Sequence, residues 1–161
     1  MARTLIVIRH AKSDWGEPIP DAERPLNERG RREAPLIGQW LTDNVEKLDL
    51  VVCSTATRAR QTWRLAAGRL RAAVRARYDE RIYDAGPDEL MSVVEDLDDA
   101  ADTAALVGHN PGLAELVERL SGERVELKTS SVAVLRWDGT WADVWARRAA
   151  LVTHATPREG S

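Results

Sequence analysis

The feature that most constrains the fold is a regular alternation of short strand-like runs with longer segments of helical spacing. The runs at 4–9, 48–54 and 102–109 are largely apolar, which is typical of strands buried on both faces. We expect strands at 4–9, 48–54, 73–78 and 102–109, and helices at 26–45, 57–73, 87–97 and 110–122. This order predicts parallel strands joined by crossover helices.

Residues near the expected helix ends support these boundaries. Asn27 is a typical N-cap for the first helix, and Pro87 suits the first turn of the third. Pro35 lies inside the first helix and is expected to kink it, because proline lacks the N–H that the helix needs there. In the fourth helix we expect a cap, a first-turn proline and a stop at Asn110, Pro111 and Gly122.

The pattern changes near the C-terminus. Residues 130–147 are typical of an antiparallel hairpin on a two-residue turn, Asp138-Gly139. Its tryptophans, Trp137, Trp141 and Trp145, are expected to be packing residues. The expected fold is therefore α/β: a three-layer α/β/α sandwich whose central sheet is mostly parallel, with an antiparallel C-terminal strand pair.

The 161 residues correspond to one domain, expected at 1–155, with a flexible tail at 156–161. The polar stretch 153–161, including His154, is expected to fray. A net charge of −3 provides no strong field for nucleic acid, and no apolar window is long enough to cross a membrane. With no signal-peptide pattern and a single cysteine, Cys53, expected to be buried, we predict a soluble cytoplasmic protein.

Basic and imidazole side chains follow three of the expected parallel strands. Arg9 and His10 end the first, Arg58 begins the helix after the second, and His109 ends the fourth. The carboxyl ends of parallel strands lie at one edge of a sheet, so these side chains are expected to meet there. Helix N-termini at the same edge add N–H donors and partial positive charge.

This combination predicts phosphoryl chemistry, although each residue alone is also typical of a solvated surface. Arginine binds phosphate oxygens through a planar fork, and its charge favours the neutral form of a nearby imidazole. Neutral imidazole can attack phosphorus, while a second histidine can stabilise the charge that develops. A metal site using His10, His109 and His154 is disfavoured by the arginines and by the absence of ligand-pair spacing, so we expect no metal and no cofactor.

Three segments carry a family resemblance. "VIRHAKS", "CSTATRARQT" and "LVGHNPGL" resemble, in order, motifs of the histidine phosphatase (phosphoglycerate-mutase-like) superfamily. "RHAKSDW", "ERPLNERG" and "TSS" are similar to its short bacterial branch, the SixA-like phosphohistidine phosphatases, and the resemblance spans residues 4 to about 137. It implies that His10 forms a phosphohistidine intermediate in a phosphate pocket of Arg9, Arg58 and His109.

The sequence departs from the family pattern near the first motif. Ala11 replaces the usual glycine, which requires a backbone geometry open to a residue with a Cβ. Gly16 occupies the position where larger members carry an asparagine that binds phosphate. Arg24 is either its substitute or a surface arginine, and Ser13 and Asp21 are the other expected substrate contacts.

The proton donor is a further departure. Larger members place a glutamate after the third strand, and Glu80 in "YDERIYDAG" occupies that position without the family's following segment. Asp21 is a second possibility. A substrate with a P–N bond asks less of an acid, because imidazole protonates near neutral pH. The acid is therefore Glu80, Asp21 or no side chain.

The resemblance implies a metal-independent phosphohistidine phosphatase that acts on a phosphorylated protein, such as a phosphotransfer domain, in signal transduction. Short connections leave no room for the lid that protects a mutase's phosphoenzyme from water. A phosphatase of small phosphoesters and a phosphate sensor without turnover are the alternatives. The preferred phosphohistidine isomer and the oligomeric state stay open.

Overall fold

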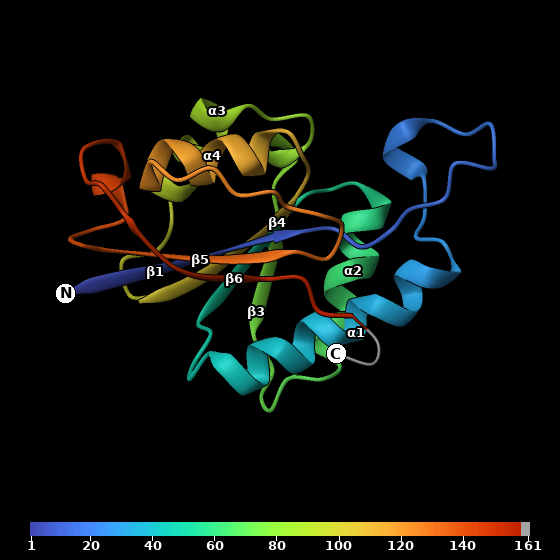
Figure 1. Ribbon diagram of the computed structural model, residues 1–161, viewed down its shortest axis with the longest axis horizontal. Coiled ribbons are helices and arrows are strands. Elements are labelled where there is room, and N and C mark those ends of the chain that lie inside the picture. Colours follow the sequence, from blue (N-terminus) through green and yellow to red (C-terminus); the bar gives the residue numbers. More distant parts are fainter. Residues whose placement is uncertain (159–161) are drawn as a thin grey trace.

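In the computed structural model, residues 1–158 are described, and they contain a six-stranded sheet in the order β3-β2-β4-β1-β5-β6 (Figure 1). β4 is parallel to β1 and β2, and β3 is parallel to β2, whereas β5 and β6 add an antiparallel pair beside β1. The strands are β1 (Ala2–Arg9), β2 (Leu50–Cys53), β3 (Arg75–Tyr78), β4 (Thr103–Gly108), β5 (Val132–Asp138) and β6 (Ala150–Ala155).

Helices cover both faces of this sheet. The helices are α1 (Glu28–Asn44), α2 (Thr57–Ala67), α3 (Pro87–Glu95) and α4 (Gly112–Ser121), with 3-10 turns η1 (Asp21–Glu23), η2 (Glu80–Ile82) and η3 (Ala142–Trp145). In Figure 1, α3 and α4 lie above the sheet and α1 lies below it. The predicted α/β sandwich, mostly parallel with an antiparallel strand pair, is confirmed.

Alternation along β1 shows why its apolar run is continuous. Leu5 and Val7 belong to the core between the sheet and helices α3 and α4. Ile6 and Ile8 belong to the core on the other face, between the sheet and helices α1 and α2. All four side chains are fully buried. Each contributes about 1.5–3 kcal/mol through its burial, so the strand is fixed on both faces and its end is held in place.

Two glycines lie where a neighbouring helix or the backbone conformation disfavours any side chain. A Cβ on Gly38 of α1 would lie 1.8 Å from the carbonyl oxygen of Ala66 in α2, so only glycine permits this approach of the two helices. Gly122 ends α4 in the left-handed region, with φ of 77°, as the sequence predicts.

The predicted helix ends are close to those observed except in α2, which ends at Ala67 instead of residue 73. Asn27 caps α1 by accepting a 2.8 Å hydrogen bond from Gly30 N, and α1 continues through Pro35. α4 begins at Gly112 instead of residue 110, with Pro111 at the N-cap. The side chain of Asn110 still accepts a bond from Ala114 N.

The predicted hairpin at 130–147 is wrong in its second strand. β5 ends at Asp138, the chain then forms η3, and the strand that pairs with β5 is β6. Trp141 and Val144, three residues apart, both point into the core, and Trp141 Nε1 donates to Ala101 O at 2.8 Å. Burying this indole favours a 3-10 turn over the extended strand that the alternating pattern predicts. Trp137 packs edge-on against Trp141, whereas Trp145 is 46% exposed.

The stretch from residue 153 contains the last residues of β6. His154 lies in β6, paired with Ala133. Within the predicted tail at 156–161, Thr156 bonds Ser131 through their hydroxyls and Arg158 donates to Thr129 O. Residues 159–161 lie outside the described part of the chain.

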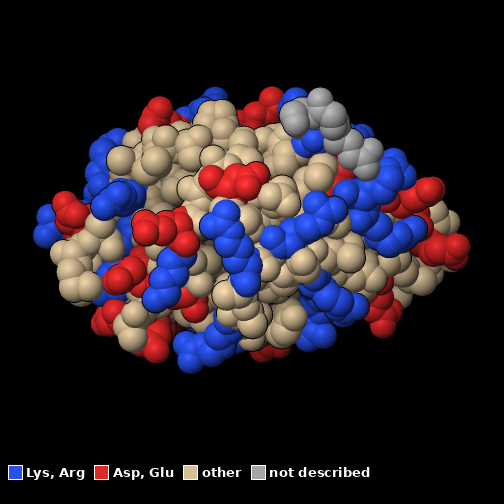
Figure 2. Space-filling view, turned by 90° about the horizontal axis from the view of Figure 1, so that it is seen from below, with Lys and Arg blue, Asp and Glu red and all other residues tan. Residues whose placement is uncertain are grey.

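The surface in Figure 2 carries charges of both signs, interspersed. No helix within residues 1–158 is long and apolar enough to cross a membrane.

Candidate active site

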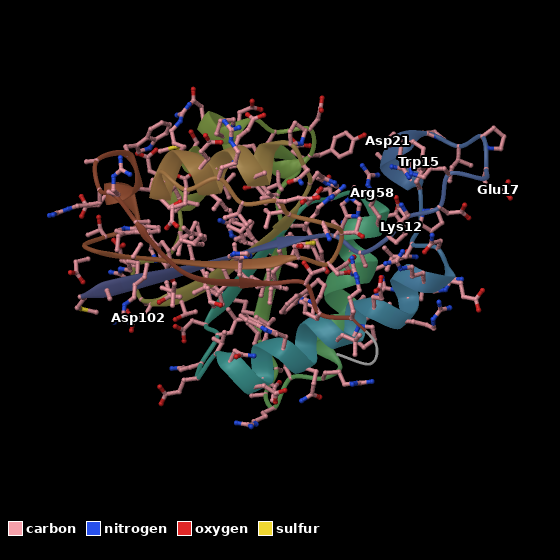
Figure 3. The ribbon with its side chains drawn as sticks, in the orientation of Figure 1. Lys12, Trp15, Glu17, Asp21, Arg58 and Asp102 are labelled. Carbon is pink, nitrogen blue, oxygen red and sulfur yellow. The ribbon has the colours of Figure 1, made fainter. Side chains whose placement is uncertain are left out.

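A cavity of about 260 Å³ lies beyond the carboxyl ends of β1, β2 and β4. Its walls come from the β1–α1 loop, the start of α2 and the segments after β4; they are formed by Arg9, His10, Lys12, Ser13, Trp15, Asp21, Arg24, Arg58, His109, Asn110 and Thr129. Figure 3 shows Lys12, Trp15, Asp21 and Arg58 together at this end of the molecule. The strand ends thus bring together most of the residues singled out in the sequence.

His10 is held in one tautomer by the chain that follows it. Its Nδ1 lies 2.7 Å from the carbonyl oxygen of Ala11, so Nδ1 carries the proton and donates it there. Burial lowers the pKa of His10 to about 3, with smaller contributions from His109, Arg58 and Arg9. The ring is therefore neutral at pH 7, and its Nε2 carries a lone pair able to attack phosphorus.

Ala11 fits this position without strain. Within residues 1–158 the non-glycine residues with positive φ are Asp84 and Ser130, so Ala11 has a φ open to any residue. Its N–H donates to Thr62 Oγ1 at 3.0 Å. The departure from glycine is thus accommodated.

His109 lies beside His10, with 5.1 Å between the ring centroids. Its Nε2 is 2.8 Å from Ser54 Oγ, at the end of β2. Burial lowers the pKa of His109 to about 4, with Arg58 the next cause. Its Nδ1 is buried and has no hydrogen-bond partner among the described residues, and His109 is one of the residues that line the cavity.

Arg9 and Arg58 place two guanidinium groups at the same cavity. Arg9 donates through one terminal nitrogen to Leu127 O at 2.9 Å, and Arg58 donates through both to Asp21. The Nε atoms of both arginines are buried without a partner among residues 1–158. Two unpartnered cationic donors beside a neutral imidazole are suited to a phosphoryl group.

Asp21 is the centre of a hydrogen-bond network at the rim. It accepts from Tyr83 Oη at 2.5 Å, from Arg24 Nε at 2.9 Å and from Arg58 at 3.0 Å. These bonds, Tyr83 first, hold the pKa of Asp21 well below its usual range, and the bond to Asp21 raises the pKa of Tyr83. Asp21 is thus a carboxylate at neutral pH and orients Arg58.

Arg24 and Ser13 belong to this network. Arg24 is buried and donates to Ser13 Oγ at 2.8 Å and to Asp14 O at 3.1 Å. Its guanidinium also lies over the indole of Trp15, 3.4 Å from the ring centroid. Arg24 is therefore not a surface arginine. Its guanidinium already bonds Ser13, Asp14 and Asp21, so it is not directed at phosphate alone.

Glu80 is not brought to this cavity. It lies in η2 with an exposed side chain, and it is not one of the cavity-lining residues within the described chain. The residue after η2 is Tyr83, and its hydroxyl is the group that reaches the network around Asp21.

Sequence reasoning missed Ser54, Tyr83 and Trp15. Ser54 directly follows the buried strand β2, just as His10 follows β1, so the same reasoning about strand ends could have found it. Tyr83 reaches Asp21 across 62 positions in the chain, and no local pattern indicates such a contact.

Within residues 1–158, no group of three or more His, Cys, Asp and Glu side chains is arranged to hold a metal ion.

A larger cavity, of about 510 Å³, lies at the opposite end of the sheet, where Figure 3 labels Asp102. Asp49 in its wall accepts hydrogen bonds from the N–H groups of Asp102 and Thr103, which ties adjacent strand ends together.

Comparison with known proteins agrees with this geometry. The family described as the histidine phosphatase superfamily (branch 1) matches residues 5–157. An uncharacterized protein of Mycobacterium tuberculosis is 45% identical over 162 residues, which cover 94% of this chain and 100% of that protein. Among solved structures, a candidate phosphohistidine phosphatase SixA from Nakamurella multipartitia has 32% identity and a TM-score of 0.88, covering 98% of this chain and 97% of its own. Its counterpart from Agrobacterium tumefaciens has 29% identity and a TM-score of 0.81, covering 96% and 99%.

Proposed function

The chain belongs to branch 1 of the histidine phosphatase superfamily and to its SixA-like group, and from this membership we propose that it is a metal-independent phosphatase of phosphohistidine in proteins. The observation that carries the proposal is the cavity around His10. A neutral imidazole, fixed with its Nε2 lone pair available, lies among the unpartnered donors of Arg9, Arg58 and His109.

The chemistry proceeds in two displacements. The Nε2 lone pair of His10 attacks phosphorus, and the electron pair of the substrate's P–N bond leaves with the substrate imidazole. A water molecule then attacks the phosphorus, the bond to His10 breaks, and phosphate and free His10 are restored. Arg9, Arg58 and His109 stabilise the negative charge on the transferred oxygens in both steps.

The charge of Asp21 and the position of Glu80 favour a P–N substrate over an alkyl ester. An alkyl phosphate needs a proton on its departing oxygen, but Asp21 has a lowered pKa and Glu80 is not at the cavity. The imidazole of phosphohistidine leaves with a proton acquired near neutral pH, so it needs no acid from the protein. This argument supports phosphohistidine over small alkyl esters, which stay the alternative substrates.

The partner that we propose is a phosphorylated protein, such as a phosphotransfer domain in the cytoplasm. The solved relative from Nakamurella multipartitia is described as a candidate phosphohistidine phosphatase SixA. The cavity is also bordered by exposed residues, including Trp15 and Lys12, so a phosphorylated side chain on another protein can enter it.

The test measures release of phosphate from a phosphotransfer domain that a kinase has phosphorylated on histidine. The assay is run with and without excess EDTA. We expect turnover unchanged by EDTA, a phosphoenzyme that is acid-labile and alkali-stable, and loss of both in His10→Ala. Activity that EDTA removes and a divalent cation restores would contradict metal independence. A covalent intermediate that persists in His10→Ala would assign the nucleophile elsewhere.

A further inference from the structure

Trp15 is placed differently from the buried tryptophans of this chain. Its side chain is 73% exposed, whereas Trp63, Trp137 and Trp141 are buried. It lies in the loop between β1 and η1, which projects beyond the end of the sheet (Figures 1 and 3), and it lines the candidate active-site cavity. A single exposed apolar residue is common on protein surfaces, but one that lines a reaction cavity can contact the substrate.

The indole is held in position from one side. The guanidinium of Arg24 lies over the ring, and Arg24 is itself fixed by Ser13 and Asp21. Because Asp21 also holds Arg58, the indole and the phosphate-binding guanidinium share one rigid support. With one face covered and most of the ring still exposed, Trp15 offers a preorganised surface to an incoming ring.

The charge around the cavity explains why an aromatic surface is useful there. Four cationic side chains line it beside one carboxylate, Asp21, and they attract the phosphoryl group; the four are Arg9, Lys12, Arg24 and Arg58. They also repel the ring of phosphohistidine, which is a cation while its free nitrogen is protonated and becomes neutral imidazole once the P–N bond has broken. The π-surface of an indole attracts a cation without adding a full negative charge that would compete for the arginines.

We propose that Trp15 forms the aromatic wall of a leaving-group subsite, which contacts the imidazole ring of phosphohistidine as that ring departs. This proposal rests on the proposed function. It deepens that function, because it assigns the preference for an aromatic nitrogen leaving group to one side chain outside the expected phosphate pocket.

The test compares two small P–N substrates, phosphoimidazole and phosphoramidate, of which only the first has an aromatic leaving group. The measured quantity is the ratio of their kcat/KM values. We expect Trp15→Ala to lower the preference for phosphoimidazole about tenfold, consistent with the loss of one contact between aromatic rings. Trp15→Phe should restore most of it. Trp145→Ala, at an exposed tryptophan in η3, is the matched control and should keep the wild-type ratio.

The outcomes separate this proposal from the function on which it rests. If the wild-type protein hydrolyses no P–N substrate, including phosphohistidine in a protein, the proposed function is wrong. If it does, but Trp15→Ala keeps the wild-type ratio, the subsite is wrong and the function stands. A loss in Trp15→Ala confined to phosphohistidine in a protein would also overturn the subsite, because Trp15 would then contact the protein surface.

Discussion

Asp21 holds the guanidinium of Arg58 at two points: its carboxylate accepts a hydrogen bond of 3.0 Å and its backbone carbonyl one of 2.7 Å. The two residues are 37 positions apart. This pairing fixes the plane of the guanidinium and leaves Nε unpartnered within the described chain. We therefore predict that Asp21 acts through Arg58, as a positioning residue.

Asp21→Asn is expected to reduce kcat/KM by roughly 10- to 100-fold, the effect of losing a hydrogen bond to a charged group. The loss should be equal for p-nitrophenyl phosphate and an alkyl phosphate, because positioning of Arg58 affects the phosphoryl group and not the leaving group. Steady-state kinetics with both substrates checks this. A larger loss for the alkyl ester would instead make Asp21 the proton donor.

Ser54→Ala tests how His109 is oriented. Ser54 Oγ accepts from Ala56 N at 3.2 Å, so its own proton can be donated to Nε2 of His109, and Nδ1 then carries the ring proton. We expect nitrogen NMR to show one His109 tautomer in the wild-type protein and a mixture in Ser54→Ala, with kcat lowered about tenfold. Ser92→Ala, on α3, is the control. An unchanged tautomer in Ser54→Ala would contradict this assignment.

The strand ends were predictable because they depend on local chemistry. An apolar run that stops at Arg9 and His10 marks both the end of β1 and the edge of the sheet where the cavity lies. The same reasoning places Arg58 and His109 at this edge, and the structure brings all four side chains to one cavity.

The parts that the sequence did not predict depend on distant contacts. The turn at η3 forms because Trp141 is buried against Ala101, far away in the chain. Glu80 was expected at the site from the family resemblance, but η2 leaves its side chain exposed. Tyr83 reaches Asp21 only because the fold brings η1 and η2 together. Such contacts follow from packing, which periodicity does not encode.

The pH dependence of stability follows from the two buried histidines. Their pKa values fall from 6.5 to about 3 in His10 and about 4 in His109, so below pH 6.5 the unfolded chain binds protons that the folded chain does not. The free energy of unfolding should therefore fall as pH decreases from about 6.5 to about 4, by about 1 kcal/mol per pH unit for each histidine. Asp21, with a lowered pKa, adds to the loss only near and below pH 4.

Urea unfolding at pH 7, 6 and 5 measures this effect. The slope against pH should be smaller in His10→Asn and in His109→Asn than in the wild-type protein. His154→Asn, in β6, is the control and should keep the wild-type slope. Equal slopes in all four proteins would mean that neither cavity histidine is held in its neutral form.

The last prediction concerns the proton donor. If no carboxylic acid of this chain protonates the leaving group, Glu80→Gln should keep kcat/KM within about twofold for every substrate, as surface substitutions do. The wild-type protein should then hydrolyse p-nitrophenyl phosphate and phosphoimidazole much faster than an alkyl phosphate, because nitrophenolate and imidazole leave without help while an alkoxide does not. Glu95→Gln, an exposed glutamate of α3, is the matched control. A selective loss of alkyl phosphate turnover in Glu80→Gln, absent from Glu95→Gln, would show that η2 moves its glutamate to the cavity when substrate binds, and would restore Glu80 as the general acid.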